Sequence, residues 1–365
     1  MLRGGRRVSG TRRCPGSRGA EHPVPGSACR WTRAQARVPR EPIAVVNPRS
    51  MVNRPRHRRS FRLALLLALG VACAHGGATG PGGQRTVEQV DVVAGFLAAW
   101  QEVRSAPRAD QVSRTRQELL EHHPELFGPE VFGPGAALDR DLERLLVEMP
   151  RLEPKLHALS DRMAGEIERS ARRFLDDFPE LAWSGPVASS LSFSHFEAVW
   201  RTVGGRRTLV LGLDAIAFYR GPYAAVEPVV HHALAGALLP AWKAPGPAPL
   251  WWSLWEEAFP LAAVRTLDPG ASDADLRLTE EGKDPAYLAA LARRVRGVLD
   301  STRESDRRVL FGTGGATASG GRWLALRVGQ NVLAGRTLHD APRLEGPALR
   351  SAIEAALVAL ERPAI

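Results

Sequence analysis

The chain has 365 residues and a formal net charge of +10 at pH 7, a value that would suit a protein of nucleic acids or anionic surfaces. The charge is confined to one end, however. Residues 1–72 contain 16 Arg, no Lys and two acidic residues, which leaves 33 of the 49 basic and 37 of the 39 acidic residues for the rest of the chain. Because phosphate binding needs a basic face on the folded domain, we expect no nucleic-acid partner. All three cysteines lie at or before Cys73, which excludes disulfides, multi-cysteine zinc sites and cysteine nucleophiles from the remainder.

Residues 1–50 are rich in Arg, Pro, Gly and Ser and show almost no apolar periodicity. This composition is typical of disordered segments. We predict that Met51 is the true start and that residues 1–50 are upstream sequence included by a misplaced start. The alternative is a genuine basic arm that precedes an internal export signal.

Residues 51–73 have the pattern of an export signal, with an Arg-rich segment followed by about ten apolar residues at 63–72. The apolar run is about half the length that a membrane-spanning helix needs. Its ending, Gly70-Val71-Ala72-Cys73, resembles a bacterial lipobox. The resemblance implies a lipidated Cys73, the membrane as a partner and an outer-membrane lipoprotein. The alternative is ordinary cleavage after Ala72 or Ala74, which would leave a periplasmic or secreted protein.

Residues 74–85 are small and polar and predict a flexible linker. Residues 86–184 then predict a helical N-terminal subdomain. Apolar residues recur at three-to-four spacing from Thr86 to about Arg104. Further helices are predicted at 108–122, 140–149 and 151–177, and Pro150 is expected to separate the last two.

Residues 185–365 predict a second domain, in which strands at 188–193, 198–203 and 207–213 precede two helices at 222–239 and 250–266. Gly204-Gly205 is expected to form the turn between the last two strands. The predicted fold class is therefore α+β and predominantly helical, with a small antiparallel or mixed sheet beside the helix that contains His231.

The strongest functional signal is the incomplete metal-binding motif His231-His232-x-x-Ala235. In a zinc peptidase, H-E-x-x-H places two imidazoles one helical turn apart, and the Glu activates the water bound to zinc. The chain retains the first His of this pattern. His232 stands where the general base is expected and Ala235 stands where the second ligand is expected. Glu257 follows at a distance that suits a third ligand.

Several short sequence segments around this motif resemble, in the same order, segments of a bacterial family of zinc-dependent peptidases that is similar to the gluzincins. They are Val210-Leu211-Gly212-Leu213-Asp214, Val229-Val230-His231-His232, Leu254-Trp255-Glu256-Glu257 and Leu267-Asp268-Pro269-Gly270. The resemblance covers about 185–365. It implies a zincin-like domain in which His231 and Glu257 would be metal ligands and an edge strand would line a peptide-binding cleft.

Loss of one ligand and of the general base predicts a non-catalytic protein with no resident cofactor and a binding or scaffolding role, whose partner would be a peptide or another envelope protein. His231 would then donate a hydrogen bond to Glu257 or to a backbone carbonyl. The alternative is an active zinc peptidase with the ligands Glu227, His231 and Glu257. Glu227 lies one turn before His231, but Pro228 predicts that the helix begins at this point.

Overall fold

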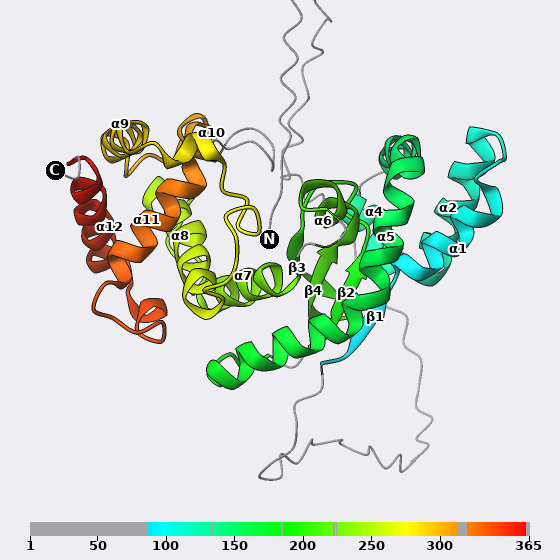
Figure 1. The fold of residues 1–365 in the computed structure, drawn as a ribbon, viewed down its shortest axis with the longest axis horizontal. Helices are drawn as coiled ribbons and strands as arrows, with labels where there is room; N and C mark the ends of the chain where they lie inside the picture. The colour runs from blue at the N-terminus through cyan, green and yellow to red at the C-terminus, as the bar shows by residue number, and fades with distance from the viewer. Residues whose placement is uncertain are drawn as a thin grey trace, which may run out of the picture. The chain divides into compact units, whose positions relative to one another are not determined.

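The computed structural model describes residues 87–132, 135–183, 185–221, 223, 225–311 and 320–362, which belong to one compact unit, Gly77–Ile365 (Figure 1). The predicted upstream segment 1–50, the signal segment 51–73 with Cys73 and the linker 74–85 lie outside the described residues. None of the helices described is both long enough and apolar enough to cross a membrane.

A small mixed sheet contains four strands in the order β1 (Gln89–Asp91), β2 (Val187–Ser190), β4 (Arg206–Gly212) and β3 (Ala198–Val203). The first two pairs are parallel, whereas β3 is antiparallel to β4 and forms one edge. Gly204 and Gly205 connect β3 to β4 with φ angles of 55° and 77°, a conformation that glycine adopts readily. The predicted glycine turn is confirmed.

Twelve α-helices make up most of the described chain, so the predicted α+β, predominantly helical class is confirmed. They are α1 (Val93–Val103), α2 (Arg108–His122), α3 (Pro124–Phe127), α4 (Pro129–Phe132), α5 (Gly135–Asp177), α6 (Leu213–Tyr219), α7 (Glu227–Leu238), α8 (Leu250–Leu267), α9 (Pro285–Arg296), α10 (Glu304–Phe311), α11 (Gly321–Leu333) and α12 (Gly346–Leu360). Short 3₁₀ turns lie at Glu280–Lys283 and Ala341–Arg343.

The prediction of a helix from Thr86 was wrong for its first part. Residues 89–91 form β1 and pair with β2, and α1 begins only at Val93. The apolar spacing that indicated a helix comes from valines, which are β-branched and suit a strand equally well. The partner strand lies about a hundred residues later, so local periodicity could not reveal the pairing.

The predicted break at Pro150 was also wrong, because α5 continues through Pro150 and Pro154. A proline removes one intrahelical hydrogen bond and bends a helix, but it does not have to end one. Met149, Leu152 and Leu156 are buried on the same stripe on both sides of these prolines. Their packing against the core maintains the helix despite the lost hydrogen bond.

Three helices position the candidate site: α8 packs against both α7 and α11, and α7 also packs on α5 and β3 (Figure 1). Trp255 and Phe259 of α8 are fully buried, so the aromatic residues of this helix belong to the core. Helices α8 and α11 approach closely at Gly329, where a Cβ atom would lie 2.3 Å from the carbonyl oxygen of Ala258. Arg322, in the first turn of α11, forms an ion pair with Glu257 of α8.

Candidate functional site

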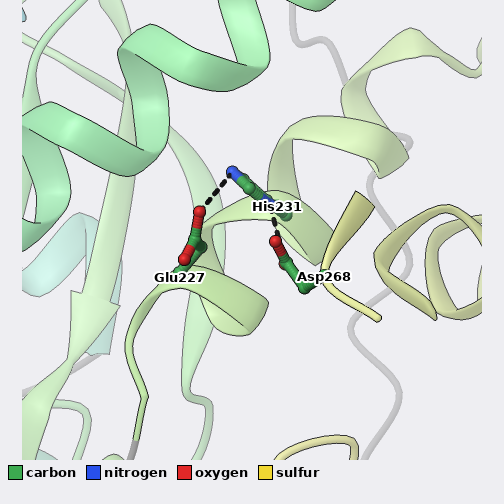
Figure 2. Close-up of side chains that lie close together, drawn as sticks. All are labelled: Glu227, His231 and Asp268. Carbon is green, nitrogen blue, oxygen red and sulfur yellow. Dashed lines mark hydrogen bonds and ion pairs between the residues drawn. The ribbon is translucent and has the colours of Figure 1, made fainter. Parts of the chain in front are cut away.

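His231 is a fully buried residue of α7 whose two ring nitrogens both face acceptors. Nδ1 lies 2.7 Å from Oδ2 of Asp268, and Nε2 lies 3.0 Å from the carbonyl oxygen of Ser170 on α5. Figure 2 shows the ring between Asp268 and Glu227. A hydrogen bond from His231 to a backbone carbonyl was predicted, and the Ser170 contact confirms it. The ring therefore connects α7 to α5 and to the end of α8.

Glu227, His231 and Asp268 form the one group of three potential metal ligands among the residues described, with ligand atoms within 4.8 Å of one another (Figure 2). Arg173 of α5 already lies among them. Its Nη1 is 2.7 Å from Glu227 and 3.5 Å from Asp268, and its Nη2 donates to the carbonyl oxygen of Leu267. The guanidinium supplies the positive charge that a cation would bring. Since both nitrogens of His231 are also occupied, this group fits a structural network better than a metal site.

Glu257, the other predicted ligand, is not a member of that group. Its Oε1 lies 3.8 Å from Nε2 of His232 and 2.5 Å from Nη1 of Arg322, the second residue of α11. The adjacent histidines therefore face different surroundings, as expected for neighbours that project about 100° apart on a helix. The structure brings Glu227 to His231 and brings Glu257 to His232.

The ion pair of Glu257 and Arg322 determines the electrostatics of this second cluster. Burial acts to raise the pKa of Glu257, but the charge of Arg322 and the contact with His232 outweigh it and lower that pKa to about 2. Burial also lowers the pKa of Arg322, and so do the charges of two neighbouring arginines, Arg220 and Arg277. Glu257 is therefore a carboxylate at neutral pH, with a guanidinium as its counter-ion.

Arg220 and Arg277 meet a second carboxylate, that of Glu197. Arg220 donates to both oxygens of Glu197 at 2.6 and 2.7 Å, and Arg277 lies 3.4 Å from the same group. Together with Arg322 these arginines line a cavity of about 230 Å³, which we call the arginine cavity. Cavity lining also includes His232 and Ala198, the first residue of β3.

A second groove, of about 560 Å³, runs between the edge strand β3 and helix α7. Ala198, Val199 and Trp200 line it from the strand. The indole of Trp200 donates a 3.0 Å hydrogen bond to the carbonyl oxygen of Ala233, which fixes the strand against the helix. Ala198 and His232 line both the groove and the arginine cavity, so the two spaces adjoin.

Ala235, at the predicted position of the second ligand, is fully buried and faces the core. Gly236 lines the groove instead, one helical turn after His232. The cavities are therefore lined by His232 and Gly236, each one residue after the motif positions His231 and Ala235.

Sequence reasoning missed Glu197, Arg220, Arg277 and Arg322. Glu197 immediately precedes β3, Arg220 immediately follows α6, Arg277 lies in the loop after α8 and Arg322 lies in the first turn of α11. None stands in a recognisable motif. The one signal was indirect, since Arg322 opens the Arg322-Trp323-Leu324-Ala325 segment within the region of resemblance.

No protein-family model matches the chain, and neither a curated protein nor a solved structure is significantly similar to it.

Proposed function

We propose that the chain is an exported, non-catalytic binding protein that is anchored to the outer membrane through Cys73 and built on a zincin-like scaffold. The observation that carries the proposal is the position of Arg322. Its guanidinium lies 2.5 Å from Glu257, the residue that would be the third metal ligand. A protein cation thus stands where the carboxylate of an active peptidase would contact zinc.

The arrangement of β3, α7 and α8 supports a zincin-like origin. An antiparallel edge strand borders the groove, α7 contributes His232, and α8 contributes Glu257 across from it. If the H-E-x-x-H pattern is aligned to begin at His232 instead of His231, His232 corresponds to the first ligand, Ala233 to the general base and Gly236 to the second ligand.

Catalysis fails in this register as it does in the register that begins at His231. Two of the three ligands would be His232 and Glu257, and Glu257 is already paired with Arg322. Neither Ala233 nor Gly236 has a side chain that could bind zinc or accept a proton from water. The residues present do not fit a catalytic zinc site.

The groove between β3 and α7 suits an extended peptide. Within the described residues β3 pairs only with β4, so a ligand strand could add to its free side through backbone hydrogen bonds. Peptides or extended segments of other envelope proteins are therefore the proposed ligands.

A second candidate function is a zinc peptidase with Glu227, His231 and Glu257 as ligands. The 3.8 Å between Oε1 of Glu227 and Nε2 of His231 favours it. Against it, Glu227 already pairs with Arg173, Nε2 of His231 already faces the carbonyl oxygen of Ser170, and Glu257 lies beside His232 instead.

Elemental analysis of the purified protein, alongside a His231→Ala variant, tests the proposal. We expect no stoichiometric zinc in either protein and no hydrolysis of a casein or peptide-pool substrate. One zinc per chain that is lost in the variant, together with hydrolysis, would replace the binding function by the peptidase.

A further inference from the structure

We propose that Asp214 is a positioning residue of the peptide site, because its carboxylate holds the turn that leads from β2 into the edge strand β3. The inference rests on the proposed peptide-binding function and names a residue that sets the position of Ala198, which lines both the groove and the arginine cavity. Asp214 belongs to the Val210-Leu211-Gly212-Leu213-Asp214 segment of the sequence resemblance, yet it lines neither of these spaces.

Asp214 is the second residue of α6 and is fully buried. Its Oδ1 accepts hydrogen bonds from the backbone N–H of Ser192 at 2.6 Å and from the Ser192 hydroxyl at 3.0 Å. Its Oδ2 accepts a hydrogen bond from the backbone N–H of Ser194 at 2.7 Å. Burial raises the pKa of Asp214 despite these hydrogen bonds, so the charged carboxylate is held beside the turn at a net cost.

The turn itself has an unfavourable backbone conformation. Phe193 and Ser194 have φ angles of 53° and 64°, in the left-handed region that residues with a Cβ atom rarely adopt. Arg277, with a φ of 53°, is the third such non-glycine residue among those described, and it lines the arginine cavity. His195, directly after the turn, lines the same cavity. The strained residues therefore gather in or beside the lining of one cavity, a distribution typical of binding sites and ligand clamps.

The turn determines how the chain enters β3. The backbone N–H of His195 donates to the carbonyl oxygen of Ser192 at 3.0 Å, and the residues that follow line the arginine cavity. The end of β4 approaches this stretch closely, since a Cβ atom at Gly212 would lie 2.3 Å from the carbonyl oxygen of Phe196. Gly212 therefore holds the connection by close approach, and Asp214 holds it by hydrogen bonds.

The same connection sets which backbone groups β3 offers to a ligand. The backbone N–H of Gly212 donates to the carbonyl oxygen of Glu197 at 2.9 Å, so the backbone groups of this pair face each other. Because hydrogen-bonded pairs alternate along an antiparallel ladder, Ala198 and Trp200 direct their N–H and carbonyl groups to the free side of β3. The glycine turn holds the far end of β3, whereas Asp214 holds the end at Ala198.

Asp214→Asn tests this role, because an amide of the same size lacks the second acceptor oxygen for the turn. The wild type and the variant are immobilised as full-length proteins and offered a degenerate pool of hexapeptides, at a temperature at which circular dichroism shows both to be folded. Mass spectrometry quantifies the retained peptides. We expect about tenfold lower retention by the variant, because one charge-assisted hydrogen bond shifts the equilibrium between the positioned and the displaced turn by about this factor.

Ser194→Gly supplies the rescue. Glycine adopts a positive φ without the steric cost that Ser194 bears, so Asp214→Asn combined with Ser194→Gly should recover most of the lost retention. Ser192→Ala is a milder variant that removes only the hydroxyl contact of 3.0 Å and should lower retention about threefold. It replaces Asp214→Asn in the comparison if that protein does not fold.

Ile353→Val is the matched control for a loss of stability alone. Ile353 is fully buried on α12, which packs on α9 and α11, and it lines neither the groove nor the arginine cavity. The change removes one buried methyl group and lowers the stability of the protein. Retention should remain at the wild-type value.

The outcomes separate this role from a purely structural one. Wild-type retention by Asp214→Asn would overturn the positioning role and leave peptide binding intact. Equal losses in Asp214→Asn and Ile353→Val would also overturn it, because retention would then follow stability. A loss that Ser194→Gly does not recover would show that Asp214 does not act through the left-handed turn. Retention by none of the proteins, the wild type included, would overturn the peptide-binding function and the inference with it.

Discussion

Nη1 of Arg322 lies 2.5 Å from Oε1 of Glu257, so the first turn of α11 supplies a cation to the carboxylate that α8 presents beside His232. The side chain of Glu257 is about one-fifth exposed, and the charge of this guanidinium is the largest of the effects that lower its pKa. The same contact replaces the metal in the proposed scaffold and contributes to the charge of the arginine cavity. Its energetics can be measured without knowledge of the ligand.

The ion pair should make stability depend on pH. The pKa of Glu257 falls from 4.5 to about 2 on folding, so its contribution is fully present above about pH 4.5 and is lost as the pH falls toward 2. Between pH 7 and pH 3 the wild type should lose about 2 kcal/mol relative to Glu257→Gln, which lacks the titrating group. Urea unfolding of both proteins at the two pH values measures the difference. A gap that stays constant would show that Glu257 has an ordinary pKa in the folded protein.

Removal of the guanidinium alone should be more harmful than removal of both charges. Arg322→Gln leaves Glu257 buried without its counter-ion and should reduce the free energy of unfolding by about 3 kcal/mol. Arg322→Gln combined with Glu257→Gln should cost less than the single change. Arg327→Gln, an exposed change on the same helix, should alter stability by less than about 0.5 kcal/mol. Additive effects of the two single variants would mean that the pair is not coupled.

His231 should behave as a structural residue. His231→Ala removes the ring that joins Asp268 to the carbonyl oxygen of Ser170 and leaves both groups with one partner fewer. We expect a loss of about 3 kcal/mol in unfolding free energy, with no change in metal content. Glu227→Gln is the comparison, since the Glu227 side chain is 38% exposed and should contribute less than about 1 kcal/mol. Chemical denaturation of the wild type and the two variants ranks their free energies of unfolding.

Local patterns predicted much of the architecture. The β-branched runs and the Gly204-Gly205 turn gave β3 and β4 nearly to the residue, and Pro249 marked the start of α8. Features that depend on distant partners were missed. Three-residue β1 exists because β2 lies beside it, and α5 passes through Pro150 because a buried stripe continues on both sides.

The candidate site was predictable only in part for a related reason. The motif placed candidate metal ligands on α7 and α8, and the structure does bring these helices together. Which of two adjacent histidines faces the cavity depends on the rotation of α7, and that rotation is determined by packing against α5 and α8 rather than by the motif. No local sequence pattern marks Arg322 or Glu197 as members of the site. Charged residues such as these are usually solvated at the surface.

The register of the site can be tested by restoring a metal. Gly236 lies one turn after His232 on the face that borders the groove, and a Cβ atom there would meet only Pro260, at 3.8 Å. Gly236→His with Arg322→Ala should therefore place two imidazoles on the same side of α7 as Glu257, freed of its guanidinium. We expect this protein to bind about one zinc per chain by elemental analysis, as the ligand set of a three-ligand site predicts.

The matched control is Ala235→His with Arg322→Ala, which follows the register that begins at His231. Ala235 is fully buried, so this change should overpack the core, destabilise the protein by about 1 to 3 kcal/mol and add no zinc. Zinc in the control rather than in the first variant would show that the metal-binding pattern begins at His231 and not at His232.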